Sequence, residues 1–212
     1  RAKVFEAGVY APVVRRGGEA IEKHVKAEKP VLLDAGCGEG YYTKAVCPDR
    51  KMTRIGFDLS KDAVKLAARG PKTAAFFAAD LKNIPMMDHS VDVLLDIFTP
   101  ANYAEFARVL RPGGLVMKLA PRSGYLHELR TLAGERLRHQ AYDGGDVERY
   151  VHEKMNVMAQ EIISYTLDIT HDTAYHLARM TPMLAGIDVD ALDLSGVTEI
   201  TIDETLYIGS VK

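Results

Sequence analysis

The chain has 212 residues, of which 47% are hydrophobic and 26% are charged, and its formal net charge is −2 at pH 7. This composition is ordinary for a soluble globular protein, and the length suits one sizeable α/β domain with a full core. No apolar run approaches membrane-spanning length and no secretory signal is visible, so we expect a cytoplasmic protein without a membrane partner.

From the N-terminus onward, helices and strands are predicted to alternate within a single domain, residues 1–212. A mostly helical segment, 1–29, with a break near 8–12, precedes a core at 30–120 and a substrate-side and C-terminal strand region at 121–212. Strands are expected at 31–34, 53–58, 73–78, 91–97, 115–119, 162–169 and 199–209. Helices are expected at 41–46, 61–69, just before 110, from after 130 to about 140, and at 171–180. The polar residues 141–150 are expected to form a flexible excursion.

The first predicted strand ends in Asp34, and three glycines follow at alternate positions: Gly36, Gly38 and Gly40. Without a Cβ, this loop can take positive φ and let a ligand lie against its backbone. A strand that turns through such a loop into a helix is where an open α/β sheet accepts a nucleotide-like ligand. The N–H groups at the start of that helix suit a carboxylate or phosphate.

The second predicted strand ends in Asp58, about 20 residues beyond the loop, where a ribose-binding carboxylate is expected. A carboxylate there can accept both ribose hydroxyl protons. The alternative is that Asp58 caps the helix that starts near Lys61, a role that Ser60 fills equally well.

The Gly-x-Gly-x-Gly spacing after Asp34 resembles motif I of the class I AdoMet-dependent methyltransferases, whereas the Gly-x-Gly-x-x-Gly of dinucleotide dehydrogenases is absent. The resemblance runs from about 31 to 119 and includes Leu-Arg-Pro-Gly-Gly at 110–114. It implies an α/β fold, Rossmann-like, with a seven-stranded, mostly parallel sheet and helices on both faces. It also implies S-adenosyl-L-methionine as cofactor, contacted by Asp34, Gly36, Cys37, Gly38, Glu39, Gly40, Asp58, Leu59, Asp80 and Leu81. For Asp80 the implied partner is the adenine amino group, and a plain loop carboxylate is the open alternative.

Segments outside this core are similar to the bacterial 23S rRNA guanine-N1 methyltransferases. They are residues 1–12, the paired tyrosines after the glycine loop, 97–100, 125–129 and 180–182. This resemblance implies 23S rRNA as partner and contacts of Tyr10, Gly38 and Glu39 with AdoMet. Tyr125 stands where the family has a cofactor-contacting histidine. The family's N-terminal zinc module is not in this sequence, which begins at Arg1, so zinc is expected only if such a module precedes it.

Two residues near the end of the fourth predicted strand are candidates for the chemistry. Asp96 would stand beside the transferred methyl group and is the candidate base for guanine N1. The alternatives for Asp96 are a helix cap or a solvated loop carboxylate, because the family does not keep an acid there. Phe98 is a candidate for stacking on a flipped guanine, with a plain core phenylalanine as the alternative.

Basic residues gather after the fifth predicted strand and are compatible either with a phosphate-binding rim or with a solvated helix face. They are Arg122, Arg130, Arg136, Arg138, His139, Arg149 and Lys154. The two cysteines, Cys37 and Cys47, and the scattered histidines lack metal-ligand spacing, so no metal ligand is predicted.

The function that these observations favour is methyl transfer from AdoMet to a guanine N1 of 23S rRNA. A small-molecule methyltransferase on the same core and a non-catalytic AdoMet-binding module stay open as alternatives. A homodimer is also compatible with the sequence.

Overall fold

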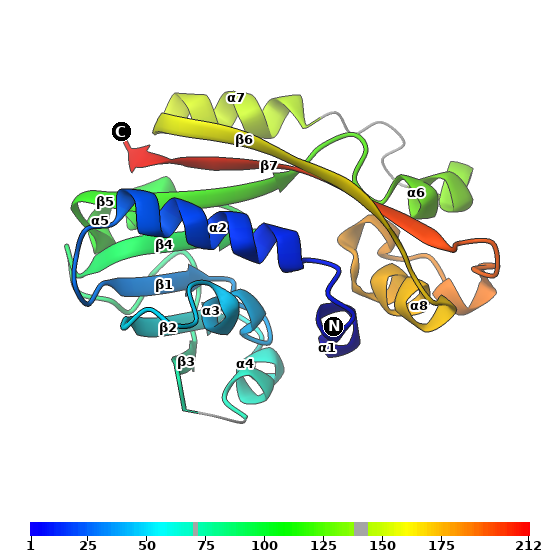
Figure 1. Ribbon diagram of the computed structural model, residues 1–212, viewed down its shortest axis with the longest axis horizontal. Helices are drawn as coiled ribbons and strands as arrows, with labels where there is room; N and C mark the ends of the chain where they lie inside the picture. Colours follow the sequence, from blue (N-terminus) through cyan, green and yellow to red (C-terminus); the bar gives the residue numbers. More distant parts are fainter. Residues whose placement is uncertain (70–71, 138–143) are drawn as a thin grey trace.

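The computed structural model describes residues 1–69, 72–137 and 144–212, and one mixed sheet forms its centre (Figure 1). Seven strands of the described chain lie in the order β3-β2-β1-β4-β5-β7-β6. The first five along this order are parallel, β7 is antiparallel to β5, and β6 is antiparallel to β7. The strands are β1 Val31–Ala35, β2 Thr53–Asp58, β3 Ala75–Ala78, β4 Val91–Ile97, β5 Leu110–Pro121, β6 Met155–Asp168 and β7 Glu199–Val211.

Helices cover both faces of the sheet because successive residues of its central strands point to opposite sides. Leu32 belongs to the core that packs under α2, whereas its neighbour Leu33 belongs to the core that packs under α5 and α7. The helices are α1 Ala2–Glu6, α2 Ala11–His24, α3 Tyr41–Ala45, α4 Lys61–Ala67, α5 Tyr103–Val109, α6 His127–Ala133, α7 Gly145–Lys154 and α8 His171–Met180. The predicted Rossmann-like sheet with helices on both faces is therefore confirmed.

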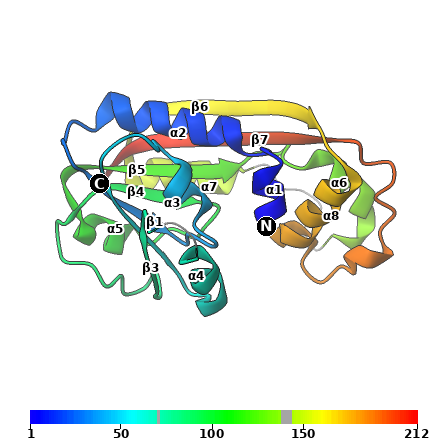
Figure 2. The same ribbon diagram turned by 60° about the horizontal axis from the view of Figure 1, so that its bottom comes forward.

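The long strands β6 and β7 extend beyond the parallel part of the sheet, and α6 and α8 lie together at their far end (Figures 1 and 2). In both views α1 lies between this end and the half of the sheet that carries α3. An exposed ion pair joins α1 to α8, with Lys3 Nζ 3.1 Å from Asp172 Oδ2. The N-terminal segment thus bridges the two halves of the molecule.

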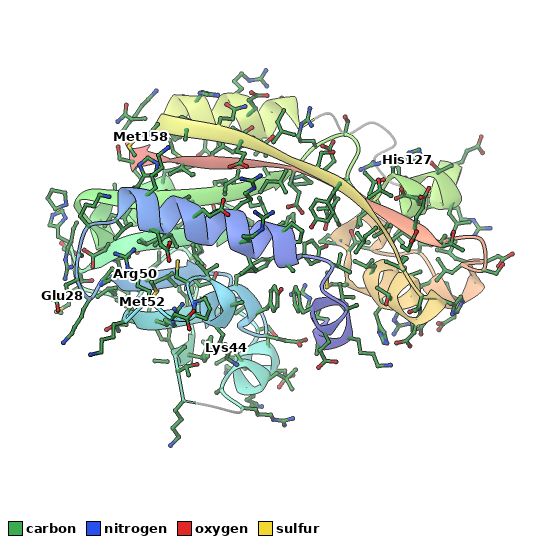
Figure 3. The ribbon with its side chains drawn as sticks, viewed as in Figure 1. Glu28, Lys44, Arg50, Met52, His127 and Met158 are labelled. Atoms are coloured by element: carbon green, nitrogen blue, oxygen red, sulfur yellow. The ribbon has the colours of Figure 1, made fainter. Side chains whose placement is uncertain are left out.

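Arg50, labelled in Figure 3, ties the loop after α3 to the end of α2. Its guanidinium donates hydrogen bonds to the carbonyl oxygens of Ile21, Val25 and Ala27 at 3.3, 2.8 and 3.0 Å. No helix among the described residues is long and apolar enough to cross a membrane.

Three sequence-based expectations were wrong in the second half of the chain. Residues 145–150 belong to helix α7 rather than to an excursion, because Val151 packs into the core while charged residues cover the other faces. Strand β6 begins at Met155 rather than at residue 162. It was missed because many polar residues alternate along this edge strand, so its first half does not look like a buried strand in the sequence. Helix α6 occupies His127–Ala133, bounded by positive φ at Leu126 and Gly134, rather than the segment after residue 130. Residues 141–143 of the expected excursion and 138–140 of the expected helix lie outside the described residues.

Strand β5 is also longer than expected at its start. Leu110 pairs with Val91 ahead of a register shift, so the Leu-Arg-Pro-Gly-Gly segment lies within the strand's bounds. Ser90 N and His89 N donate to the carbonyls of Val109 and Arg108, which continues the pairing of the two chain segments.

Candidate active site

A cavity of about 630 Å³ opens beyond the carboxyl ends of β1, β4 and β5. Strand β1 lies between β2 and β4, so the strand order runs outward from β1 in both directions. Open α/β sheets bind ligands beside the carboxyl ends of the strands at such a reversal of strand order. One end of the cavity is lined by α1 and the glycine loop, and the other by the ends of β4 and β5, α6, and residues 180–185. The cavity therefore joins the expected cofactor loop to the substrate-side region.

The glycine loop has the backbone that its sequence predicts. Gly36 has φ +73°, and a Cβ built on it would lie 2.5 Å from Thr99 Oγ1, so no side chain fits there. Gly38 has φ +54°, and its N–H donates to the Asp58 carboxylate at 2.9 Å. The loop is thus held close to β2 and to the segment after β4, with its backbone facing the cavity.

Asp34, at the end of β1, is buried and lines the cavity together with Gly36, Cys37, Gly38 and Glu39. Thr43 Oγ1 in α3 donates to Asp34 Oδ2 at 2.5 Å. Burial raises the pKa of Asp34 to about 7, and the Thr43 hydrogen bond partly offsets that rise. Asp34 therefore fixes α3 against the loop as well as facing the ligand space.

Three aromatic residues that are far apart in the sequence meet in the cavity: Tyr10, Phe98 and Tyr125. The hydroxyl oxygens of Tyr10 and Tyr125 are 2.5 Å apart, and Phe98 lies 6.0 and 5.5 Å from their ring centroids. Phe98 has φ +54°, an unusual backbone conformation for a bulky residue and one that clusters at functional sites. The structure thus brings together the two tyrosines and the phenylalanine that the sequence singled out separately.

Five of the predicted cofactor residues do not line this cavity: Gly40, Asp58, Leu59, Asp80 and Leu81. Gly40 precedes α3, and the others lie at the carboxyl ends of β2 and β3, on the side of the glycine loop away from the cavity. Ser60 is the N-cap of α4 and accepts from Ala63 N, so the capping role falls to Ser60. Asp58 accepts from Gly38 N and Ser60 N, and the exposed Asp80 accepts from Lys82 N.

Asp96, the candidate base, lies beneath the cavity rather than in its lining. It is fully buried, and Lys118 Nζ lies 3.0 Å from its Oδ2. Burial raises the pKa of Asp96 to about 6, while Lys118 opposes the rise. Lys118 itself lines the cavity and donates to the carbonyl of Thr99 at 2.8 Å. The structure therefore inserts a lysine between this carboxylate and the ligand space.

Among the described members of the predicted basic rim, Arg130 alone lines the cavity. Arg122 pairs with the buried Asp203, whereas Arg149 pairs with Asp146 and Lys154 with Glu153 through exposed side chains. Arg136 is exposed, and 138 and 139 lie outside the described residues.

The sequence did not point to Phe5, Lys118 or Glu204 as parts of the site. Phe5 lines the cavity and stacks on Tyr41 at 4.1 Å between ring centroids. Glu204 lies on β7, fully buried, and neither carboxyl oxygen has a hydrogen-bond partner among the described residues. The signal that could have pointed to Glu204 is the adjacent acidic pair, Asp203 and Glu204, which interrupts the alternation of the last predicted strand.

Relatives of known name match this chain over nearly its whole length. YxjB of Bacillus subtilis (strain 168), a proposed 23S rRNA (guanine-N(1)-)-methyltransferase, is 32% identical over 97% of this chain and 76% of its own length. The 23S rRNA (guanine(748)-N(1))-methyltransferase of Streptomyces fradiae is 29% identical over 98% of this chain and 77% of its own. The chain belongs to the 23S rRNA (guanine-N1)-methyltransferase family.

The wider comparisons show a methyltransferase domain and its fold. A methyltransferase domain model matches residues 32–114, which contain the glycine loop and the Leu-Arg-Pro-Gly-Gly segment. A proposed antibiotic-biosynthesis methyltransferase of Anabaena variabilis ATCC 29413 has the same fold, with a TM-score of 0.65, 15% identity, and 93% of this chain and 97% of that chain covered. A geranyl diphosphate methyltransferase solved with SAM superimposes with a TM-score of 0.57, 13% identity, and 93% and 84% coverage.

The residues of this family member fit the AdoMet that a methyltransferase uses. The cavity volume is in the range of small-molecule sites, and its loop end offers glycine backbone that no Cβ obstructs. The Glu39 carboxylate lines the loop end, where it suits an α-amino group, and the Asp58 carboxylate lies outside the cavity on the other side of the loop, where it suits ribose hydroxyls. The donor set therefore matches a nucleoside with an amino-acid tail.

Proposed function

We propose that this protein transfers a methyl group from S-adenosyl-L-methionine to a guanine N1 of 23S rRNA. The observation that carries the proposal is the family match over the whole chain, combined with one cavity that joins the glycine loop to an aromatic acceptor end. The names of the relatives support a guanine of 23S rRNA as the acceptor, and the shape of the cavity supports a cofactor site next to an acceptor site.

Different residues of this chain would bind different parts of the cofactor and of the acceptor. The glycine loop, Glu39 and Tyr10 would hold the amino-acid part of the cofactor in the cavity. Its nucleoside would extend past the loop to the ends of β2 and β3, with Asp58 at the ribose and Leu59, Asp80 and Leu81 around the adenine. When bound, the cofactor supplies an electrophilic methyl group on a positively charged sulfur. Phe98 and Tyr125 would align a guanine ring against it, since loop bases in RNA are bound by stacking.

Guanine N1 must lose its proton before it can accept a methyl group. Asp96 stays a proposal for this role, and it would have to act through Lys118, which separates it from the cavity. The alternative is direct loss of the proton to solvent, with the protein contributing alignment only. Asp96→Asn separates the two, because only the first predicts a large loss of kcat.

The proposal is tested with the purified protein, tritiated AdoMet and an unmodified 23S rRNA transcript. We expect tritium in the RNA and a reverse-transcription stop at one guanine, because a methyl group on N1 blocks Watson–Crick pairing. AdoMet binding without transfer to this RNA would refute the rRNA assignment, and turnover on a small acceptor would then establish the alternative class of enzyme.

Three finer expectations accompany this proposal. A homodimer and a cytoplasmic location stay predictions, and zinc enters only if a cysteine-rich module precedes Arg1. Met158, labelled in Figure 3, and Ile162 are 55% and 56% exposed on β6, an edge strand that a second copy could cover. Light scattering on the purified protein measures the oligomeric state directly.

A further inference from the structure

At the acceptor end of the cavity, one cation has no side-chain partner among the described residues. Three basic residues of the described chain line the cavity: Arg1, Lys118 and Arg130. Lys118 is engaged by Asp96 and the Thr99 carbonyl, and Arg1 lies against Gly38 at the loop end. Arg130 has no side-chain hydrogen bond or ion pair with the described residues, and its Nε is shielded from solvent. A buried donor without an acceptor is rare in folded proteins and calls for an explanation.

Arg130 is carried by a helix that is fixed firmly to the sheet. The Glu128 carboxylate accepts from Thr201 N at 2.9 Å and from Thr201 Oγ1 at 2.5 Å. Leu126 N, at the start of α6, donates to the Thr201 carbonyl at 2.8 Å, and Leu126 and Leu129 are fully buried. Leu126 has φ +51°, a strained conformation that these contacts maintain. The backbone that carries Arg130 is therefore fixed before any ligand binds, and its guanidinium is left available for one.

The walls near Arg130 suit a flat ring. Phe98 and Tyr125 provide aromatic faces of the same cavity, and Met180, the last residue of α8, and Pro182 just after it provide apolar surface. A guanidinium presents N–H groups in a rigid fork, and its commonest specific pairing with a base is bidentate, to O6 and N7 of guanine. Adenine offers a donor where guanine has O6, so the same fork does not pair with it.

We propose that Arg130 binds the O6 and N7 atoms of the acceptor guanine, while N1, on the adjoining edge, faces the methyl donor. This inference rests on the proposed guanine-N1 activity and adds the residue that selects guanine. A guanidinium on O6 also withdraws electron density from the N1–C6–O6 amide. It thereby favours loss of the N1 proton to solvent, and Arg130 itself neither gives nor takes a proton.

The test is a cycle that alters the protein and the RNA separately. Methyl transfer is measured with the unaltered protein and with Arg130→Gln, on 23S rRNA transcripts made with GTP or with 7-deaza-GTP, which removes the N7 acceptor. We expect Arg130→Gln to lower kcat/KM about 10- to 100-fold on the ordinary transcript. We expect the 7-deaza transcript to lower it about fivefold for the unaltered protein and not at all for the variant.

Matched variants separate this role from a structural one. Arg15→Gln removes an exposed arginine of α2 that pairs with Glu19 outside the cavity, and it should leave kcat/KM unchanged. Arg130→Lys keeps the charge but loses the rigid fork, and its kcat/KM should lie between those of the unaltered protein and Arg130→Gln. AdoMet affinity by calorimetry should be the same in all variants. The acid limb of kcat/KM should move to higher pH in Arg130→Gln and less in Arg130→Lys, which loss of packing alone would not cause.

The outcomes distinguish the inference from the function on which it rests. If the unaltered protein methylates the rRNA but the 7-deaza change affects both proteins equally, Arg130 does not bind N7 and the inference is wrong. An arginine that bound a phosphate would give that result. If the unaltered protein transfers no methyl to rRNA, the proposed function fails and the inference fails with it.

Discussion

At the scale of single residues, Asp58 shows how one carboxylate can serve a loop and a ligand together. One of its oxygens accepts from Gly38 N and the other from Ser60 N, at 2.9 and 2.8 Å. Each carboxylate oxygen has a further lone pair, so both backbone contacts can persist while ribose hydroxyls bind. The contacts hold Asp58 in place before the ligand arrives.

Replacement of Asp58 should weaken AdoMet binding far more than it weakens the fold. We expect Asp58→Ala to raise the Kd for AdoMet about 10- to 100-fold, because hydrogen bonds to a charged group contribute about 1.5 to 3 kcal/mol. Calorimetry measures the affinity, and thermal unfolding shows whether the fold is kept. Asp58→Asn, which retains one acceptor, should fall between. Unchanged affinity in Asp58→Ala would show that the ribose assignment is wrong.

At the scale of elements, α3 is a single turn whose end depends on a buried arginine from β2. Arg54 donates to the carbonyl oxygens of Thr43 and Val46 at 3.0 and 2.6 Å, and also to that of Cys47. A helix leaves its last carbonyls without partners, and here a charged side chain satisfies them. Arg54 therefore fixes the end of the element that carries Tyr41 and Tyr42 into the cavity.

Loss of the Arg54 guanidinium should destabilise the whole domain. Arg54→Met leaves these buried carbonyls unpaired, and we expect the free energy of unfolding to fall by about 3 kcal/mol or more. Urea titration followed by circular dichroism measures it. Arg16→Met is the matched control, because its ion pairs with Glu19 and Glu161 are exposed and should contribute less than about 1 kcal/mol. Equal effects of the two substitutions would contradict the role assigned to Arg54.

How well the sequence predicted each element follows from how local its signal was. The glycine loop and the buried parallel strands have patterns contained within a few residues, and both were predicted near their true positions. Helix α7 was not predicted because only its face around Val151 is buried, and the other faces of the helix are polar. The sequence named Arg130 and residues 180–182 separately, but it could not show that they line one cavity, because only the long-range pairing of β6 and β7 brings these segments together.

At the scale of the whole molecule, the site lies where segments from the two ends of the chain meet. Tyr10 comes from the N-terminal segment, Tyr125 follows β5, and Tyr165 of β6 donates to the carbonyl of Val9 at 2.6 Å. Burial raises the pKa of Tyr10, Tyr125 and Tyr165, and the charge of Glu204 on β7 adds to that rise. Binding at the site and stability of the fold therefore depend on the same buried groups.

Three buried carboxyl groups give the domain a distinctive dependence of stability on pH. Burial raises the pKa of Asp34 to about 7 and that of Asp96 to about 6, and burial with repulsion from Asp203 raises the pKa of Glu204 well above its usual range. Between the unfolded and folded pKa values each group holds its proton in the folded state and releases it on unfolding. The free energy of unfolding must then fall as pH rises, by up to about 1.4 kcal/mol per pH unit for each group.

The expected stability is therefore highest in mild acid and declines from about pH 4 to about pH 7, the reverse of the behaviour of salt-bridged carboxylates. Glu204→Gln tests the contribution of Glu204, because the amide has a similar size and cannot ionise. We expect its melting temperature to match that of the unaltered protein near pH 4 and to exceed it increasingly as pH rises, since an unpaired buried group costs about 1 to 3 kcal/mol. Calorimetric melting across this range measures the difference. A constant difference between the two proteins at all pH values would mean that Glu204 titrates alike in the folded and unfolded states, and so has a partner that compensates its burial.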